Sequence, residues 1–325
     1  MRYRVLGRTG FKVSELGLGG HEYRRGLNPF HFPSEWNREE FLKKQPQRTT
    51  LIERALAAGV NYFDTTFMEE AESLGLALRA LGRRRNVYIS AMIIDPFKKL
   101  KEHPKARWRD IILAGVEERL SVLQTDSIDV FHIHMPEANY SRDRLKSTLK
   151  VLRELKNQGT IGSIGASSHE LGFLAELIRK YDCFDAIMIP YNYHRQETRD
   201  IIFPLAKALE VGVVVMKPFA WPYYSIPFMR FTPVEGEEGD YTPAQVSLRW
   251  ILSTPEVATV VPGMNNQAEL EENLAAITKE GQVDESVLDR SLKAAQSPQA
   301  KDKLTSMLKD PAVDIRHYAK RALKR

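Results

Sequence analysis

The chain has 325 residues, 43% hydrophobic and 27% charged, a composition typical of a folded globular protein rather than a disordered one. No apolar run is long enough to span a bilayer and the N-terminus lacks a signal-peptide core, so we expect neither membrane insertion nor export. Cys183 is the only cysteine, which excludes an intrachain disulfide and indicates a reducing, cytoplasmic compartment. The net charge of +5 is scattered rather than gathered into a basic stripe, so nucleic acid is not an expected partner.

The first residues predict a short β-hairpin over 1–14 that turns at Gly7 and Gly10. A first inner strand is expected over 16–20, where glycines would let the backbone approach a ligand or a neighbouring strand. The segment 23–47 contains three prolines and is long for a connecting loop. Long loops of this kind often close over a binding site, so we expect a substrate lid there.

From residue 49 onwards, predicted helices and strands alternate. The helices are expected over 49–58, 70–81, 108–123, 142–157, 170–181, 195–208, 242–252 and 267–277. The strands are expected over 16–20, 60–64, 87–92, 127–136, 161–167, 186–189, 211–216 and 258–261. Eight such βα units predict an α/β fold, a closed (β/α)8 TIM barrel preceded by the hairpin.

The strand 127–136 carries two histidines near its end, His132 and His134. Side chains alternate along a strand, so both imidazoles face the same side. In a (β/α)8 barrel, ligand chemistry gathers at the carboxyl ends of the strands. The residues expected there are Gly20, Asp64, Met92, His134, Ser167, Pro190, Lys217 and Gly263.

Beyond about residue 282 the pattern changes to helices alone. We therefore divide the chain into a barrel over 1–282 and a C-terminal helical extension over 283–325. Helices are expected over 285–295, 300–309 and 313–323. A lone helical unit cannot stack into a solenoid, so the extension should dock on the barrel or on a second subunit, which would make a homo-oligomer.

Several segments resemble the aldo/keto reductase family, in order and at the expected strand ends, over about residues 1–278. The matching segments are 6–10, 59–65, 129–134, 162–167 and 261–263, followed by 270–273. The resemblance implies a (β/α)8 barrel that reduces carbonyl groups with a nicotinamide cofactor bound across its mouth. The implied substrate is a small molecule: a carbonyl compound, a sugar or a polyol.

The family's chemistry uses an Asp, a Tyr, a Lys and a His. Asp64 and His134 match the Asp and the His. Glu69 lies five residues after Asp64, where the family has its Tyr, although a shorter loop would place Phe67 or Met68 in that slot. Met92 takes the position of the Lys. A carboxyl beside Asp64 would tend to keep its proton, so Glu69 is the candidate acid that replaces the Tyr.

The resemblance also assigns cofactor contacts, several of them altered. Ser167 matches a nicotinamide contact, Ser168 replaces an Asn and Met216 replaces a stacking aromatic residue. The full set of expected contacts is Ser167, Ser168, Met216, Lys217, Gly263, Asn265, Glu269, Glu272 and Asn273. NAD(H) and NADP(H) are both family cofactors, and Glu269 would repel a 2′-phosphate, which favours NAD(H).

Three functional hypotheses remain open from the sequence. The first is a carbonyl or alcohol oxidoreductase with an unusual proton donor. The second is a non-redox acid/base enzyme that uses Asp64, Glu69, His132 and His134 on a sugar or polyol. The third is a catalytically silent protein that binds or assembles, with no cofactor at all. A metal is not expected, because one strand supplies only two histidine ligands.

Overall fold

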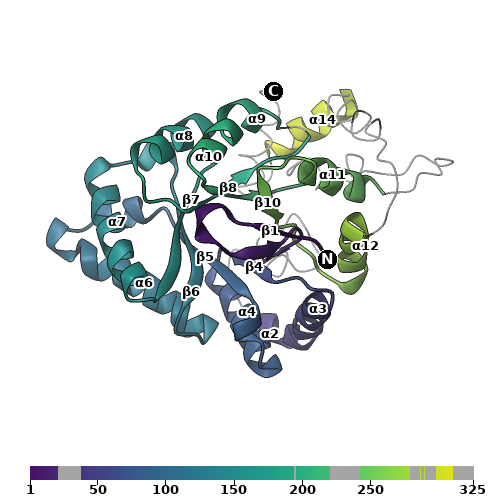
Figure 1. Ribbon diagram of the computed structural model, residues 1–325, viewed down its shortest axis with the longest axis horizontal. Coiled ribbons are helices and arrows are strands. Elements are labelled where there is room, and N and C mark those ends of the chain that lie inside the picture. Colours follow the sequence, from purple (N-terminus) through teal and green to yellow (C-terminus); the bar gives the residue numbers. More distant parts are fainter. Residues whose placement is uncertain are drawn as a thin grey trace.

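A computed structural model describes residues 1–20, 38–193, 195–219, 242–278, 286, 289 and 298–309 (Figure 1). Eight parallel strands form one sheet in chain order. They are β3 (Leu18–Gly19), β4 (Tyr62–Thr65), β5 (Tyr88–Ile94), β6 (Ile128–His134), β7 (Ile161–Ser167), β8 (Ala186–Pro190), β9 (Gly212–Met216) and β10 (Val257–Val260). The predicted order of eight parallel strands is confirmed.

The first and last strands meet and close the ring. Parallel bridges join Leu16 to Val260 and Gly19 to Gly263. The amide of Gly17 donates to the carbonyl of Val260 at 2.8 Å. A side chain at Gly19 would lie 2.9 Å from the carbonyl oxygen of Val261, so the glycine is what permits this close approach. The sequence prediction of a (β/α)8 barrel is therefore confirmed.

Helices surround the strands (Figure 1). They are α2 (Arg38–Lys43), α3 (Gln45–Ala57), α4 (Met68–Leu81), α5 (Pro96–Lys101), α6 (Trp108–Leu123), α7 (Arg142–Asn157), α8 (Leu171–Lys180), α9 (Thr198–Ile201), α10 (Phe203–Ala208), α11 (Pro243–Leu252), α12 (Gln267–Thr278) and α14 (Pro298–Met307). The single helix expected over 195–208 is two short helices. Pro204 lies in the first turn of α10, and because it has no amide N–H it cannot continue a helix from α9.

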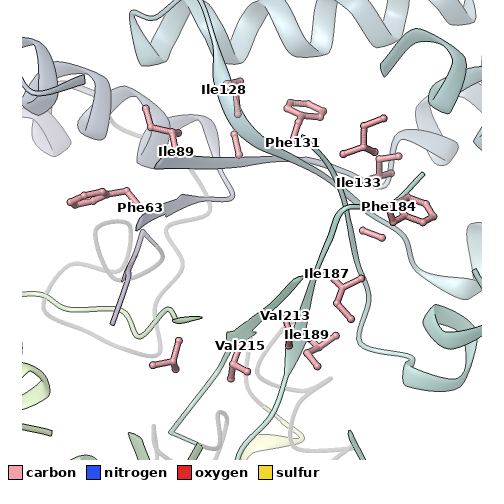
Figure 2. Packing of buried hydrophobic residues seen from close by; sticks show 14 of the residues in the cluster. Phe63, Ile89, Ile128, Phe131, Ile133, Phe184, Ile187, Ile189, Val213 and Val215 are labelled. Carbon is pink, nitrogen blue, oxygen red and sulfur yellow. The ribbon is translucent and has the colours of Figure 1, made fainter. Parts of the chain in front are cut away.

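Two layers of side chains result from the alternation along each strand. Phe131 and Ile133 of β6 face outwards into the layer between strands and helices, as Figure 2 shows. Val130 faces the barrel interior, together with Met188 of β8 and Val214 of β9. This alternation assigns His132 and His134 to the interior face, as the sequence predicts.

The N-terminal hairpin, β1 (Tyr3–Val5) and β2 (Lys12–Ser14), covers one end of the barrel. In Figure 1 its purple ribbon crosses the centre of the ring. Arg4 donates to the carbonyls of Leu252, Thr254 and Val257, all at or before the start of β10. The hairpin therefore closes the amino ends of the strands, and the opposite, carboxyl end is left for ligands.

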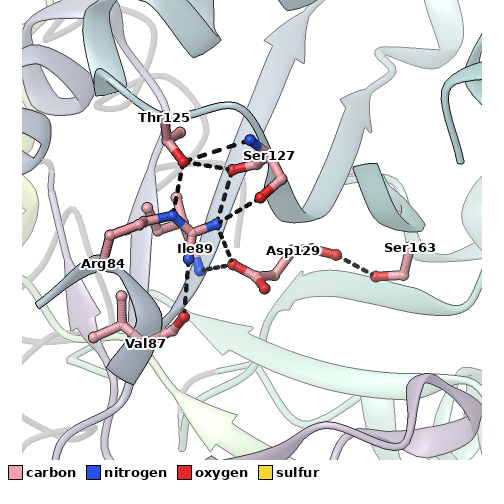
Figure 3. Close-up of polar contacts among 7 residues, drawn as sticks. All are labelled: Arg84, Val87, Ile89, Thr125, Ser127, Asp129 and Ser163. Atoms are coloured by element: carbon pink, nitrogen blue, oxygen red, sulfur yellow. Dashed lines mark hydrogen bonds and ion pairs between the residues drawn. The ribbon is translucent and has the colours of Figure 1, made fainter. Parts of the chain in front are cut away.

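A polar cluster near the amino ends holds β5 and β6 in register (Figure 3). Arg84 donates to the Thr125 hydroxyl at 2.9 Å and to Asp129 Oδ2 at 3.0 Å. The same carboxylate oxygen accepts the amide of Ile89 at 2.8 Å. These bonds fix the register in which Met92 lies opposite His132 and Ile94 lies opposite His134.

A polar contact joins the described part of the C-terminal region to the barrel. The hydroxyl of Tyr193, in the segment after β8, donates to Asp289 at 2.6 Å. Leu304 of α14 is buried. The helix expected over 285–295, apart from residues 286 and 289, lies outside the described residues, as do the helix expected over 313–323 and the lid expected over 23–47 up to residue 37. None of the helices that the structure describes combines the length and apolar character needed to cross a membrane.

Candidate active site

Pairing of the neighbouring strands β4 and β5 brings Asp64 and Ser90 together. The Ser90 hydroxyl donates to Asp64 Oδ1 at 2.7 Å, and both side chains are buried. The two residues are register partners, so the contact follows directly from strand pairing. The sequence analysis identified Asp64 but not Ser90, because only the register between strands reveals that neighbour.

Met92 occupies the next inward-facing position on β5. Its side chain is 4% exposed and packs in the apolar interior cluster. A thioether carries no charge and cannot form an ion pair with Asp64. The position at which the resemblance implies a Lys therefore contributes packing and no cation.

His134 lies at the carboxyl end of β6 and is half-buried. Its Nδ1 lies 3.3 Å from the hydroxyl of Ser167, its register partner on β7. The ring of His169 lies edge-on to it, with 5.4 Å between ring centroids and 67° between ring planes. His169 follows β7 directly and was not singled out from the sequence, since nothing in the local pattern shows that the chain turns back towards β6.

His132 has a different environment from His134. It is fully buried one step deeper in the barrel, beside Gly165 of β7. A side chain at Gly165 would lie 2.2 Å from His132 Nδ1, so the glycine provides the space for the ring. Burial lowers the pKa of His132 to about 4, so the imidazole is neutral at physiological pH. His132 is therefore part of the interior, and His134 is the histidine at the mouth.

Two adjacent glutamates begin α4 and have different surroundings. Glu69 is half-buried in the first turn. Glu70 is fully buried, and its Oε2 accepts the backbone amides of Thr66 at 2.7 Å and Phe67 at 3.3 Å. A side chain at Gly20 would lie 2.9 Å from the same oxygen. Glu70 thus caps the N-terminus of α4 beside the end of β3. It stands three residues after Phe67, the N-cap residue, which is the usual position of a capping glutamate.

The residues expected around a nicotinamide ring lie along β7 and β9. Ser167 is buried at the end of β7, whereas the Ser168 hydroxyl donates to Glu170 at 2.9 Å at the start of α8. Met216 is half-buried against the interior cluster. Lys217 follows with a left-handed backbone (φ 58°), and its carbonyl accepts the Asn192 side chain at 2.9 Å.

The residues expected near an adenosine lie at the start of α12. Gly263 bridges to Gly19 at the barrel edge. Glu269 accepts the backbone amide of Asn265 at 2.7 Å and the side-chain amide of Asn266 at 3.2 Å. Its carboxylate therefore occupies the N-terminus of α12, where backbone N–H groups would otherwise favour an anion. In the same helix, Glu272 accepts the hydroxyl of Thr242 at 2.7 Å and Asn273 is buried.

Comparison with known proteins identifies the family. The model of the aldo/keto reductase family matches residues 30–225 and 234–292, and the chain belongs to this family. Its members are oxidoreductases that act on small carbonyl compounds with a nicotinamide cofactor. L-galactose dehydrogenase from Arabidopsis thaliana is 25% identical over 299 residues, covering 85% of this chain and 88% of the relative.

Two solved structures show the same fold. An aldo-keto reductase from Bacillus halodurans, in its holo form, superposes with a TM-score of 0.67 at 23% identity, covering 90% of this chain and 96% of that one. An aldo-keto reductase from Klebsiella pneumoniae in complex with NADPH gives a TM-score of 0.69 at 18% identity, with 92% and 97% covered. Within the described residues, no three His, Cys, Asp or Glu side chains gather in a way that could hold a metal ion.

Proposed function

We propose that this protein is a nicotinamide-dependent oxidoreductase that interconverts a small carbonyl compound and its alcohol, with His134 as the group that handles the proton. The observation that carries the proposal is the position of His134. It stands half-buried at the carboxyl end of β6, hydrogen-bonded to Ser167, in a barrel of the aldo/keto reductase family. Imidazole is the side chain most often used for proton transfer near neutral pH.

The residues along β7 and β9 are suited to a nicotinamide ring. Ser167 offers a hydroxyl at the mouth, and Met216 offers a polarisable apolar surface for a flat ring. When bound, the reduced nicotinamide would supply a hydride to the carbonyl carbon. The chain's own task is then to place the carbonyl oxygen near His134 and to protonate it.

Glu269 supports NAD(H) rather than NADP(H) as the cofactor. Its carboxylate already accepts the amide of Asn265 at the N-terminus of α12. A 2′-phosphate at this place would meet the negative charge of Glu269 beside the N-terminus of α12. Gly263, Glu272 and Asn273 would then contact the rest of the adenosine, and Lys217 would meet the pyrophosphate.

Glu69 is the second candidate for the proton donor. It lies in the first turn of α4, close in sequence to the end of β4 that carries Asp64. Asp64, held by Ser90, would orient neighbouring donors in place of the Asp–Lys pair of the family. The two donors are separable, because Glu69 and His134 come from different elements and can be replaced independently.

The test is a cofactor-consumption assay with the full chain. NADH or NADPH oxidation is followed with a panel of short aldehydes, ketones and aldoses, in the wild type, His134→Gln and Glu69→Gln. We expect turnover that falls at least about 100-fold in His134→Gln and much less in Glu69→Gln. The reverse order would make Glu69 the donor, and equal activity in all three proteins would overturn the assignment of His134.

A non-redox acid/base enzyme acting on a sugar or polyol is the second candidate. The specific observation in its favour is Met92, which leaves Asp64 beside a hydroxyl where the family has a cation. This alternative predicts isomerisation or dehydration of an aldose without any nicotinamide, and loss of that conversion in His134→Gln. A protein that binds neither cofactor and converts nothing would fit the silent hypothesis instead.

A further inference from the structure

Two imidazoles face each other at the mouth of the barrel, and the proposed function uses only one of them. His169 comes from the segment between β7 and α8, and its ring lies 5.4 Å from that of His134, inclined by 67°. Both side chains are half-buried. At this separation a positive charge on one ring opposes a positive charge on the other, and partial burial strengthens the effect.

The position of His169 is fixed by a neighbouring loop. Arg195, in the segment after β8, donates from its guanidinium to the carbonyl oxygen of His169. Arg195 is itself held by Glu197 at 2.9 Å, and its amide donates to the carbonyl of Asn192 at 2.8 Å. His169 is therefore anchored from a second strand end rather than lying on an unsupported turn.

Ser167 fixes the other ring. Its hydroxyl lies 3.3 Å from His134 Nδ1. The Ser167 hydroxyl and the edge-on ring of His169 thus both contact the His134 ring and restrict its plane. Among the residues that the structure describes, ionisable groups near the pair include His132, which is buried two residues earlier on β6, Glu170, which accepts the Ser168 hydroxyl, and the Arg195 guanidinium.

We propose that His134 and His169 form a coupled pair in which protonation of one ring opposes protonation of the other, with His169 as a positioning residue that sets the ring plane of His134. When His134 is the imidazolium that donates, His169 is the neutral ring. This inference rests on the proposed function for its catalytic consequence, but the coupling itself does not depend on any activity.

The proton balance of the carbonyl reduction follows from the pair. A bound reduced nicotinamide would supply a hydride to the carbonyl carbon, and the carbonyl oxygen would gain the proton of His134. His134 becomes neutral, which removes the repulsion on His169 and allows the pair to take up one proton from water. In the direction of alcohol oxidation, the neutral ring accepts the hydroxyl proton and the same steps run in reverse.

The coupling is tested by NMR titration of the histidine ring protons in the intact chain. Wild type is compared with His169→Phe, which keeps an aromatic ring but cannot titrate, and with His134→Gln, which assigns the His134 signal. In His169→Phe we expect the midpoint of the His134 titration to move upward, because the competing charge is gone. An unchanged midpoint would overturn the proposal. His103→Phe, at an exposed histidine after α5, is the matched control.

The catalytic consequence is tested by turnover and by rescue. We expect His169→Phe and His169→Ala to lower kcat about tenfold or more, with KM for the nicotinamide unchanged. Added imidazole should restore part of the activity of His169→Ala, which a purely structural role would not allow. The positioning role of His169 would be overturned if His169→Phe kept full activity and imidazole did not change the activity of His169→Ala. If the wild type has no turnover, the proposed function fails, and the NMR titration still decides the pairing.

Should His169→Phe fail to fold, as judged by its thermal transition, His169→Gln replaces it in both measurements. Glutamine removes the titration while keeping a polar side chain of similar length. The expected upward midpoint of His134 is the same for this variant, and an unchanged midpoint overturns the proposal in the same way.

Discussion

The hydroxyl of Ser90 donates to Asp64 across the β4–β5 strand pair, at 2.7 Å and out of contact with solvent. The resemblance to the aldo/keto reductases implies that Asp64 would pair with a Lys at the position of Met92, which lies on β5 two residues after Ser90. A neutral hydroxyl stabilises a buried carboxylate less than an ammonium group does. The side chain of Met92 therefore supplies no cation to Asp64.

Removal of the Ser90 hydroxyl should destabilise the fold. Ser90→Ala takes a hydrogen-bond donor from a buried carboxylate, which typically costs about 1–3 kcal/mol. The free energy of unfolding in urea is the measurement. Ser121→Ala, at an exposed serine of α6, is the control and should change stability by less than about 0.5 kcal/mol. Equal effects in both variants would contradict the importance of the Asp64–Ser90 bond.

Gly165 should tolerate no side chain, whereas Gly172 should. In Gly165→Ala the new methyl group would meet His132 Nδ1 at 2.2 Å, while nothing lies within 4 Å of a methyl group at Gly172 in α8. We expect Gly165→Ala to cost about 1–3 kcal/mol. Gly172→Ala should stabilise by about 0.5–1 kcal/mol, because alanine is the better helix former. Thermal unfolding of both variants measures these changes in stability. A Gly165→Ala variant as stable as the wild type would show that the His132 ring is placed elsewhere.

Stability should fall in mild acid because of His132. Burial lowers the pKa of this imidazole to about 4, against about 6.5 in the unfolded chain. Between these values the unfolded state binds the proton and the native state does not, so the free energy of unfolding decreases as the pH falls from 6.5 to 4. The contribution is on the order of 3 kcal/mol over this window. Urea unfolding at pH 7 and pH 5 should show a steeper loss in wild type than in His132→Gln. The same loss of stability in wild type and His132→Gln would show that other groups take up the proton.

Glu269 should determine the preference between the two nicotinamide cofactors. In Glu269→Gln the charge facing a 2′-phosphate is removed while a side-chain oxygen remains to accept the Asn265 amide. We expect the affinity for NADPH relative to NADH to rise about tenfold, equivalent to about 1.4 kcal/mol. Isothermal titration measures both cofactors. Glu271→Gln, at an exposed residue paired with Arg54 at 3.6 Å, is the control and should leave the ratio unchanged.

Much of the fold could be predicted because local signals coincide with tertiary structure. The helices 108–123 and 142–157 have the predicted ends, since an apolar stripe with a period near 3.6 runs their full length. The two-part helix over 198–208 was missed because its apolar pattern continues through Pro204. The strand that ends in His134 was also predicted, together with the face on which its histidines lie.

A site residue could be predicted only where its position follows from the pattern of the strand that carries it. Asp64, His134 and Ser167 lie at strand ends that alternation alone locates. Ser90 depends on the register between two strands, and His169 depends on the path of a loop, so neither can be derived from local spacing. Glu69 and Glu70 are neighbours in sequence, and which of them is buried depends on the residue at which α4 begins.

The oxidoreductase function is tested most directly by titrating the intact chain with NADH and with NADPH, followed by quenching of protein fluorescence and by isothermal calorimetry. We predict saturable binding of one nicotinamide dinucleotide per chain, tighter for NADH than for NADPH. Binding should be unchanged in His134→Gln, because that residue handles a proton rather than the cofactor. Absence of binding for both cofactors at millimolar concentration would contradict an oxidoreductase function for this barrel.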